Sequence, residues 1–181
     1  KASMDCSQIN KLQGVTRRMM NQPTENRLLR ALPEDSKNRL FPKLKLIEFP
    51  LGKVIFDAGE NISTVYFPTD SIVSLLSTMA DGSSAEISVV GNEGLVGIAV
   101  FMGGESTPNC AIVQSAGYAY RLPATELRSE FNSNQTFRML LLRYTQALIA
   151  QMAQTAVCNR HHSIDQQLCR WLLLSLDRLS S

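Results

Sequence analysis

Hydrophobic residues between positions 44 and 123 come in short runs that are separated by turn-forming residues. Each run has the length of a β-strand and is rich in Val, Ile, Leu, Tyr or Phe. The runs span residues 44–49, 53–57, 64–67, 71–80, 85–90, 110–115 and 118–122. Asp81-Gly82 is the clearest hairpin signal between them, because both residues tolerate a positive φ. Many short strands at this spacing predict an antiparallel sandwich, roll or barrel.

A helical pattern precedes the strands. Leu28, Leu29 and Leu32 form a short apolar stripe after Thr24, which is a candidate N-cap residue. A second helical turn is predicted directly afterwards, over residues 34–41.

The chain after the strands is predicted to be helical. A short helix is expected over residues 124–131 and a long helix over residues 135–160. Ser163-Ile-Asp-Gln166 has the form of a capping box that begins a last helix. The predicted fold class is therefore α+β, with an antiparallel β-roll flanked by helices.

The long helix is apolar over much of its circumference. A helix of about 25 residues spans about 38 Å, which is longer than a small β-domain needs for its own cover. Its apolar seam is formed by Phe137, Leu141, Tyr144, Leu148, Met152 and Ala156. We expect one face of the helix to pack on the strands and another to pack on the same helix of a second copy, with this seam as the dimer interface. The alternative is a single amphipathic helix that lies across its own domain.

Composition and charge exclude several classes of protein. The 181 residues are 44% hydrophobic, which suits one compact domain with an appended helix. A net charge of +2 from 18 basic and 16 acidic residues is too balanced to indicate a nucleic-acid surface. The chain has no apolar run of the ~18–20 residues that would span a membrane, so we expect a cytoplasmic protein. Residues 1–22 are interpreted as an N-terminal extension, of which the first 19 are candidates for a non-native segment.

Residues that could carry metal or catalytic chemistry are few and dispersed. The four cysteines are Cys6, Cys110, Cys158 and Cys169, and they include no CxxC pair. The two histidines, His161 and His162, are adjacent, and neighbouring residues do not easily point at one metal. There is no G-x-S-x-G motif. We therefore expect no enzyme, no metal site and reduced thiols.

The order of these parts resembles the Crp/Fnr transcription regulators. Residues 50–60, Pro-Leu-Gly-Lys-Val-Ile-Phe-Asp-Ala-Gly-Glu, followed by Val65-Tyr66-Phe67, are similar to the opening of that family's cyclic nucleotide-binding fold. Residues 158–178 look like the segment that leads into the family's winged helix–turn–helix. The resemblance implies a jelly-roll sensor domain over residues 23–134 that is cyclic-nucleotide-binding-like.

The resemblance also implies how the remaining parts function. It assigns a dimerisation helix to residues 135–160, and a hinge with the first helix of a DNA-binding domain to residues 161–181. It implies an effector-sensing homodimer that binds DNA through a helix–turn–helix beyond residue 181. RNA polymerase is a further expected partner of such a full-length protein.

The family's nucleotide site is a small cassette in which helix N–H groups and an arginine hold the cyclic phosphate. The resemblance places the ligand-binding residues at Gly91, Glu93, Gly94, Leu95, Val96, Gly97, Thr107, Asn109 and Cys110. However, no Arg or Lys lies between Lys53 and Arg121, and Glu93 precedes Gly94, which reverses the family's order. A buried phosphate without a cation is costly, so we do not expect classical cyclic AMP binding.

Three other possibilities for the sensor stay open. The first is an unidentified small-molecule effector, and the second is a degenerate pocket that binds no cyclic nucleotide. The third is a haem or redox sensor that uses a histidine, Cys110 or Cys158. No cofactor is certain.

The last helix carries a charged face. It is formed with the preceding segment by Arg160, Asp165, Arg170, Asp177 and Arg178. These side chains are expected either to be solvated or to contact the DNA-binding domain. Residues 158–163 are the expected hinge between the two last helices.

Overall fold

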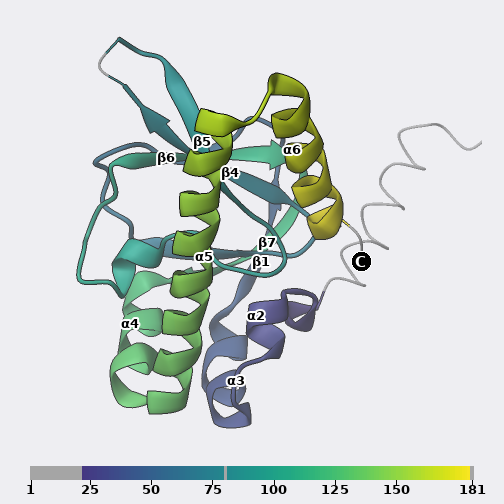
Figure 1. The fold of residues 1–181 in the computed structure, drawn as a ribbon. Helices are drawn as coiled ribbons and strands as arrows, with labels where there is room; N and C mark the ends of the chain where they lie inside the picture. The colour runs from purple at the N-terminus through teal and green to yellow at the C-terminus, as the bar shows by residue number, and fades with distance from the viewer. Residues whose placement is uncertain (1–21, 80, 180–181) are drawn as a thin grey trace, which may run out of the picture.

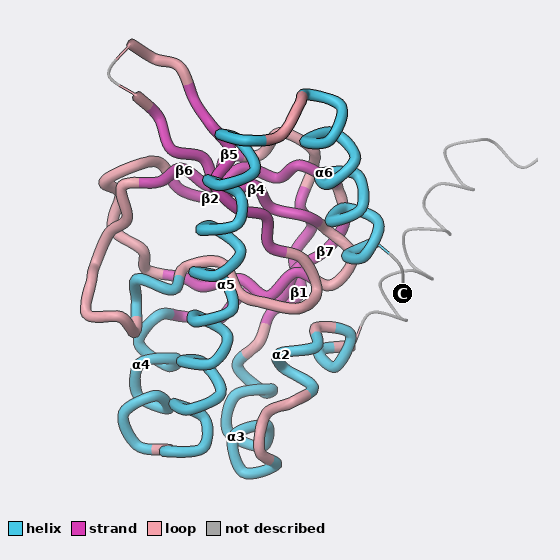
Figure 2. Tube along the Cα trace, in the orientation of Figure 1, coloured by secondary structure: helices cyan, strands magenta, loops and turns pink. Residues whose placement is uncertain are grey.

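Two antiparallel sheets form a β-roll in the computed structural model, which describes residues 22–79 and 81–179. One sheet has the order β1-β7-β3, with β1 at Lys45–Phe49, β7 at Gly117–Pro123 and β3 at Thr64–Pro68. The other has the order β2-β6-β4-β5, with β2 at Val54–Phe56, β6 at Asn109–Ser115, β4 at Ile72–Thr78 and β5 at Ser84–Val90. Helices flank this roll (Figure 1), and the strands lie together behind them (Figure 2). The predicted α+β roll and its seven strands are confirmed.

The expected hairpin at Asp81-Gly82 joins β4 to β5. Thr78 pairs with Ser84 at its closed end. Gly82 has a φ of 84°, and the Asp81 carboxylate accepts hydrogen bonds from the Ser83 backbone N–H (2.9 Å) and from its hydroxyl (2.6 Å). The turn therefore forms as predicted at Gly82, where glycine adopts a left-handed conformation without a side-chain clash, whereas Asp81 has no positive φ and stabilises the turn through its carboxylate.

The N-terminal helices are short and pack on the roll. They are the 3-10 helix η1 at Pro23–Glu25, α2 at Arg27–Arg30, α3 at Glu34–Leu40 and the 3-10 helix η2 at Phe41–Lys43. Thr24 lies inside η1, so its prediction as an N-cap was wrong. Asn26 caps α2 instead, because its side chain accepts from Leu29 N (2.9 Å) and its amide donates to the carbonyls of Pro68 and Gly94 (both 2.8 Å). These extra bonds attach the cap to the roll.

Three helices follow the roll. They are α4 at Ala124–Ser133, α5 at Gln135–His161 and α6 at Ile164–Leu179. Asn134 separates the first two and caps α5 by accepting from Phe137 N (3.1 Å). The predicted capping box begins α6, since Ser163 N donates to Gln166 Oε1 (3.0 Å) and Gln166 N donates to Ser163 Oγ (3.4 Å). The chain turns at His162, and α6 runs back beside the roll (Figure 1).

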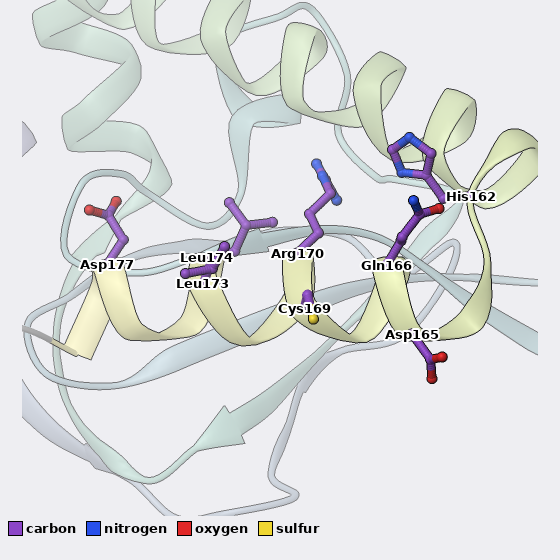
Figure 3. Close-up of a pocket in the computed structure, with 8 residues that line it drawn as sticks. All are labelled: His162, Asp165, Gln166, Cys169, Arg170, Leu173, Leu174 and Asp177. Carbon is purple, nitrogen blue, oxygen red and sulfur yellow. The ribbon is translucent and has the colours of Figure 1, made fainter.

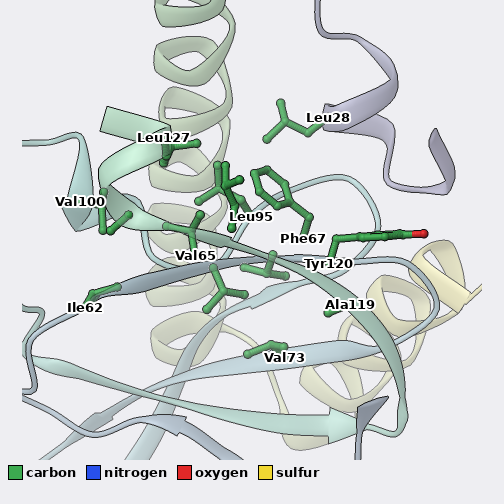
Figure 4. Packing of buried hydrophobic residues seen from close by; sticks show 14 of the residues in the cluster. Leu28, Ile62, Val65, Phe67, Val73, Leu95, Val100, Ala119, Tyr120 and Leu127 are labelled. Atoms are coloured by element: carbon green, nitrogen blue, oxygen red, sulfur yellow. The ribbon is translucent and has the colours of Figure 1, made fainter. Parts of the chain in front are cut away.

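The hydrophobic core lies between the roll and its covering helices. Strand residues such as Val65 and Phe67 meet Leu95 there, together with Leu127 of α4 and Leu28 of α2 (Figure 4). All five side chains are buried. The core therefore connects elements from both ends of the described chain.

The seam predicted as a dimer interface faces this core. Phe137, Leu141 and Leu148 are buried within their own chain, and Tyr144 and Met152 pack against the same core. The assignment of Phe137, Leu141 and Leu148 to a partner-facing surface was therefore wrong, whereas Tyr144 and Met152 are only partly buried and their assignment stays a prediction. Their side chains cover the roll, where they bury more apolar area than an exposed face could.

The opposite face of α5 is exposed and has its own pattern. We call it the outer stripe, and it consists of Met139, Leu142, Gln146, Ile149, Ala153 and Ala156. Successive members are three and four residues apart, which is the heptad spacing of helices that pack on each other lengthwise. Of the residues predicted for the interface, Ala156 alone belongs to this stripe.

A buried carboxylate joins the N-terminal helices to the α4–α5 junction. Glu130, whose side chain is 5% exposed, accepts two hydrogen bonds from Arg39 (2.7 and 2.8 Å) and one from Ser36 Oγ (2.7 Å). Asn134 Nδ2 donates to the same carboxylate (3.1 Å). The hydrogen bonds from Arg39 outweigh the effect of burial and lower the pKa of Glu130 from 4.5 to about 2.

This lowered pKa predicts how stability depends on pH. The stabilisation from ionised Glu130 is complete above pH 4.5 and is lost as the pH falls towards 2, because the folded state must then take up a proton that the unfolded state has already bound. Arg39 is half-exposed, so we expect about 1–2 kcal/mol in total. Glu130→Gln should flatten the fall of the denaturation midpoint over this window. Glu126→Gln, which removes the more exposed pair with Lys43, is the control, and an unchanged acid profile in Glu130→Gln would refute the assignment.

Candidate functional site

A tight turn begins the segment between β5 and β6, and it contains residues that the sequence assigns to ligand binding. We call Gly91–Gly97 the cassette turn. Val96 exchanges two backbone hydrogen bonds with Tyr66 of β3 (2.8 and 3.1 Å), and Gly97 has a φ of 107°. The expected short helix after it is a single 3-10 turn, η3 (Ile98–Val100).

Gly94 is the point where α5 approaches the cassette turn most closely. A side chain at this position would overlap the Tyr144 ring, whose hydroxyl donates to Leu95 O (3.0 Å). Burial raises the pKa of Tyr144, so the phenol stays neutral. The close backbone approach predicted for a ligand is therefore used by a tyrosine of the same chain.

Arg178 of α6 reaches the other end of the cassette turn. Its Nε donates to Glu93 Oε1 (2.7 Å), its Nη2 to Gln151 Oε1 (3.1 Å) and its Nη1 to Leu174 O (2.8 Å). The residue is only 6% exposed. A Cβ on Gly91 would lie 2.8 Å from Arg178 Cβ and Cγ, so the absence of a side chain there makes room for the arginine.

A second carboxylate faces α6 from the roll. Glu86 of β5 accepts a hydrogen bond from Ser74 Oγ (2.6 Å), and the Trp171 side chain lies near it. Burial raises the pKa of Glu86, while the hydrogen bond from Ser74, the Trp171 side chain and the charges of Arg178 and Arg170 act in the opposite direction. The side of α6 that meets the roll is thus cationic and polar, and the roll presents acidic groups to it.

The nine predicted ligand-binding residues do not form one site. Asn109 pairs with Ser77 whereas Val90, next to the cassette turn, pairs with Val73. These two points are four residues apart along β4, or about 13 Å. Thr107, Asn109 and Cys110 therefore lie apart from the cassette turn, while the Leu95 and Val96 side chains are buried in the core.

The Cys110 end of this region contacts the loop that follows β2. Asn109 N donates to Thr107 Oγ1 (3.3 Å), Thr107 O accepts from Gly59 N (2.7 Å), and the Cys110 thiol lies 3.8 Å from Asp57 Oδ1. Burial, with the nearby Asp57 charge, raises the pKa of Cys110. A raised pKa keeps the thiol protonated, which does not favour redox chemistry at this cysteine.

A groove of about 560 Å³ runs along α6 (Figure 3). Its lining residues are His162, Asp165, Gln166, Cys169, Arg170, Leu173, Leu174 and Asp177. None of the nine predicted ligand-binding residues lines it. Among the residues that the structure describes, no group of three or more His, Cys, Asp or Glu side chains could hold a metal, and no helix is long and apolar enough to cross a membrane.

Sequence reasoning missed the two residues that complete the cassette contacts. Arg178 was predicted as part of a charged face, and Gln151 was not singled out. Both come from helices far along the chain from the cassette, so only the return of α6 after His162 brings them to Glu93. The only signal for these two residues in the sequence was the absence of an Arg or Lys near the cassette turn.

Comparison with known proteins agrees with this fold. Residues 46–134 match the cyclic nucleotide-binding domain family. This match covers 89 of the chain's 181 residues, and the chain has the antiparallel β-roll with flanking helices that its sequence predicts, a fold similar to that of solved regulator structures. No curated protein sequence matches the chain.

Three solved structures illustrate the likeness. The c-di-GMP responsive global regulator CLP of Xanthomonas campestris is 12% identical, with a TM-score of 0.63 over 77% of this chain and 70% of that chain. FixK2 of Bradyrhizobium japonicum is 13% identical, with a TM-score of 0.66 over 76% and 68%. The sensor domain of the transcriptional regulator DNR from Pseudomonas aeruginosa is 16% identical, with a TM-score of 0.59 over 77% and 94%. At these identities the likeness is one of fold.

The contact between Gly94 and Tyr144 gives a test of the site geometry. Gly94→Ala should lower the free energy of unfolding by about 1–3 kcal/mol, because the new methyl group overpacks against the ring. In a Tyr144→Leu background the same substitution should cost clearly less, since the ring is gone. Chemical denaturation of the four proteins measures this coupling. Equal costs in both backgrounds would show that the two residues are not in contact.

Proposed function

We propose that this chain is the effector-sensing and dimerisation region of a Crp/Fnr-type transcription regulator. The observation that carries the proposal is the two-sided use of α5. Its inner face belongs to the core of the roll, and its outer stripe is exposed along the same helix. A helix shared in this way can pass a change in the roll to a second copy and to whatever follows α6.

The outer stripe suits a two-fold dimer. Its heptad spacing would bring two antiparallel or parallel copies of α5 together lengthwise, and Ala153 and Ala156 would permit a close approach near the α6 end. Met139, Leu142 and Ile149 would supply apolar contacts that solvent now surrounds. DNA and RNA polymerase are proposed as partners of the full-length regulator on the basis of its resemblance to the family.

Dimerisation can be tested at the outer stripe. The double substitution Leu142→Glu and Ile149→Glu should yield a folded monomer, with dimer affinity reduced by at least about 100-fold, because four carboxylates would have to be buried together. Sedimentation equilibrium measures the mass. The matched control is Leu51→Glu, which puts the same charge at an exposed apolar residue of the roll. A native protein that is monomeric at micromolar concentration, or a variant that remains dimeric, would contradict the proposal.

We infer further that the cassette turn does not bind cyclic AMP. The turn carries the Glu93 carboxylate and no cation of its own, and Tyr144 and Arg178 fill the space beside it. A cyclic phosphate placed there would meet a like charge in a partly desolvated site. This supports the alternative of a pocket that is degenerate towards cyclic nucleotides, or one that takes a different effector.

A thermal-shift series distinguishes the ligand classes. Cyclic AMP should leave the unfolding midpoint unchanged even at millimolar concentration, because a ligand that does not bind the native state adds no stability. Cyclic di-GMP, the ligand class named for the similar regulator CLP, and haem are the comparison probes. A rise of several degrees with cyclic AMP would overturn the inference.

A further inference from the structure

We propose that the cassette turn binds an arginine side chain, and that Arg178 occupies this site and so holds α6 on the roll. We call the contact between Arg178 and Glu93 the latch. The regulatory meaning of this latch rests on the proposed function, but the latch itself does not. The group bound at the cassette turn is a guanidinium, whose charge is opposite to that of a cyclic phosphate.

The site is built from groups that suit a guanidinium. The Glu93 carboxylate and the Gln151 amide oxygen accept from two of its nitrogens, while the third donates within α6 itself, to Leu174 O. Glu93 is itself oriented by Gly91 N, which donates to its other oxygen (3.2 Å). Every nitrogen of the buried guanidinium thus has an acceptor, which is the condition for burying a charge without a large penalty.

The orientation of α6 indicates that polar contacts hold the helix in place. Its apolar stripe, Ile164, Leu168, Leu172 and Leu176, faces away from the roll, and each of these residues is between 46% and 83% exposed. If hydrophobic burial positioned α6, this stripe would lie against the roll. The roll instead receives Arg178, which donates to Glu93, and the Trp171 side chain lies near Glu86. A helix held by a few polar contacts can be released at low cost.

Release of α6 would change both of its faces. Removing Arg178 would leave Glu93 as a free carboxylate beside the cassette turn, so a guanidinium-bearing segment of another partner could take its place. It would also free the apolar stripe of α6 to pack elsewhere. Arg178 also donates to Gln151 of α5, so its release removes a contact from the helix that carries the outer stripe.

Trp171 reports on the latch because it is the chain's single tryptophan and lies on α6, near Glu86 of the roll. Glu93→Gln and Arg178→Gln should each release the helix, shift the emission of Trp171 to the red and raise its quenching by acrylamide by about two-fold from the 39% exposed state. The double variant should show no more than either single variant, because the two residues act as one pair. Gly91→Ala should have the same effect without any change of charge, because its Cβ would displace the stem of Arg178.

Glu48→Gln is the matched control, since it removes an exposed carboxylate from β1 by the same substitution. Circular dichroism checks that the roll stays folded. If Arg178→Gln does not fold, Trp171 quenching in Glu93→Gln and Gly91→Ala tests the latch. Native Trp171 quenching in these variants, or additive effects in the double variant, would overturn the latch. The readout needs neither a dimer nor DNA. A monomeric protein with a released helix in Glu93→Gln would therefore refute the proposed function and leave the latch standing.

Discussion

The packing of α5 against the roll is the constraint on which the rest of the structure depends. The inner residues of this helix complete the core, and Tyr144 lies directly on the Gly94 backbone. Because these side chains are committed to their own chain, the outer stripe is the heptad-spaced face of α5 that stays exposed for a second copy. The same packing sets the direction in which the chain leaves α5, and so brings α6 back to the cassette turn.

The charge at the cassette turn is the second determinant, and it has the opposite sign to that of a phosphate site. Glu93 occupies the turn, and the cation that neutralises it comes from α6. A fold that matches the cyclic nucleotide-binding domain family can therefore use its cassette as a contact for its own C-terminal helix. The fold does not determine the ligand here, because the roll depends on apolar packing whereas the site depends on a few charged groups.

The sequence predicts the strands, the long helix and the α6 capping box well, because alternating runs, glycine turns and the Ser163–Gln166 pair are local signals. It does not decide which face of α5 is inner. Leu148 and Ile149 are both large and apolar, and only the position of the roll buries one and exposes the other. The contact of Arg178 with Glu93 is equally inaccessible, since it depends on where α6 returns. Local patterns thus predict elements, whereas the site arises from long-range packing.

Oxidative cross-linking of single cysteines placed on α5 tests the division of this helix into two faces most directly. In a chain whose four native cysteines are replaced, Ile149→Cys on the outer stripe should form a disulfide-linked dimer readily. Ala147→Cys, which is also exposed but lies on the opposite flank of the helix, should remain monomeric under the same conditions. Equal cross-linking at both positions, or none at position 149, would contradict a dimer formed along the outer stripe.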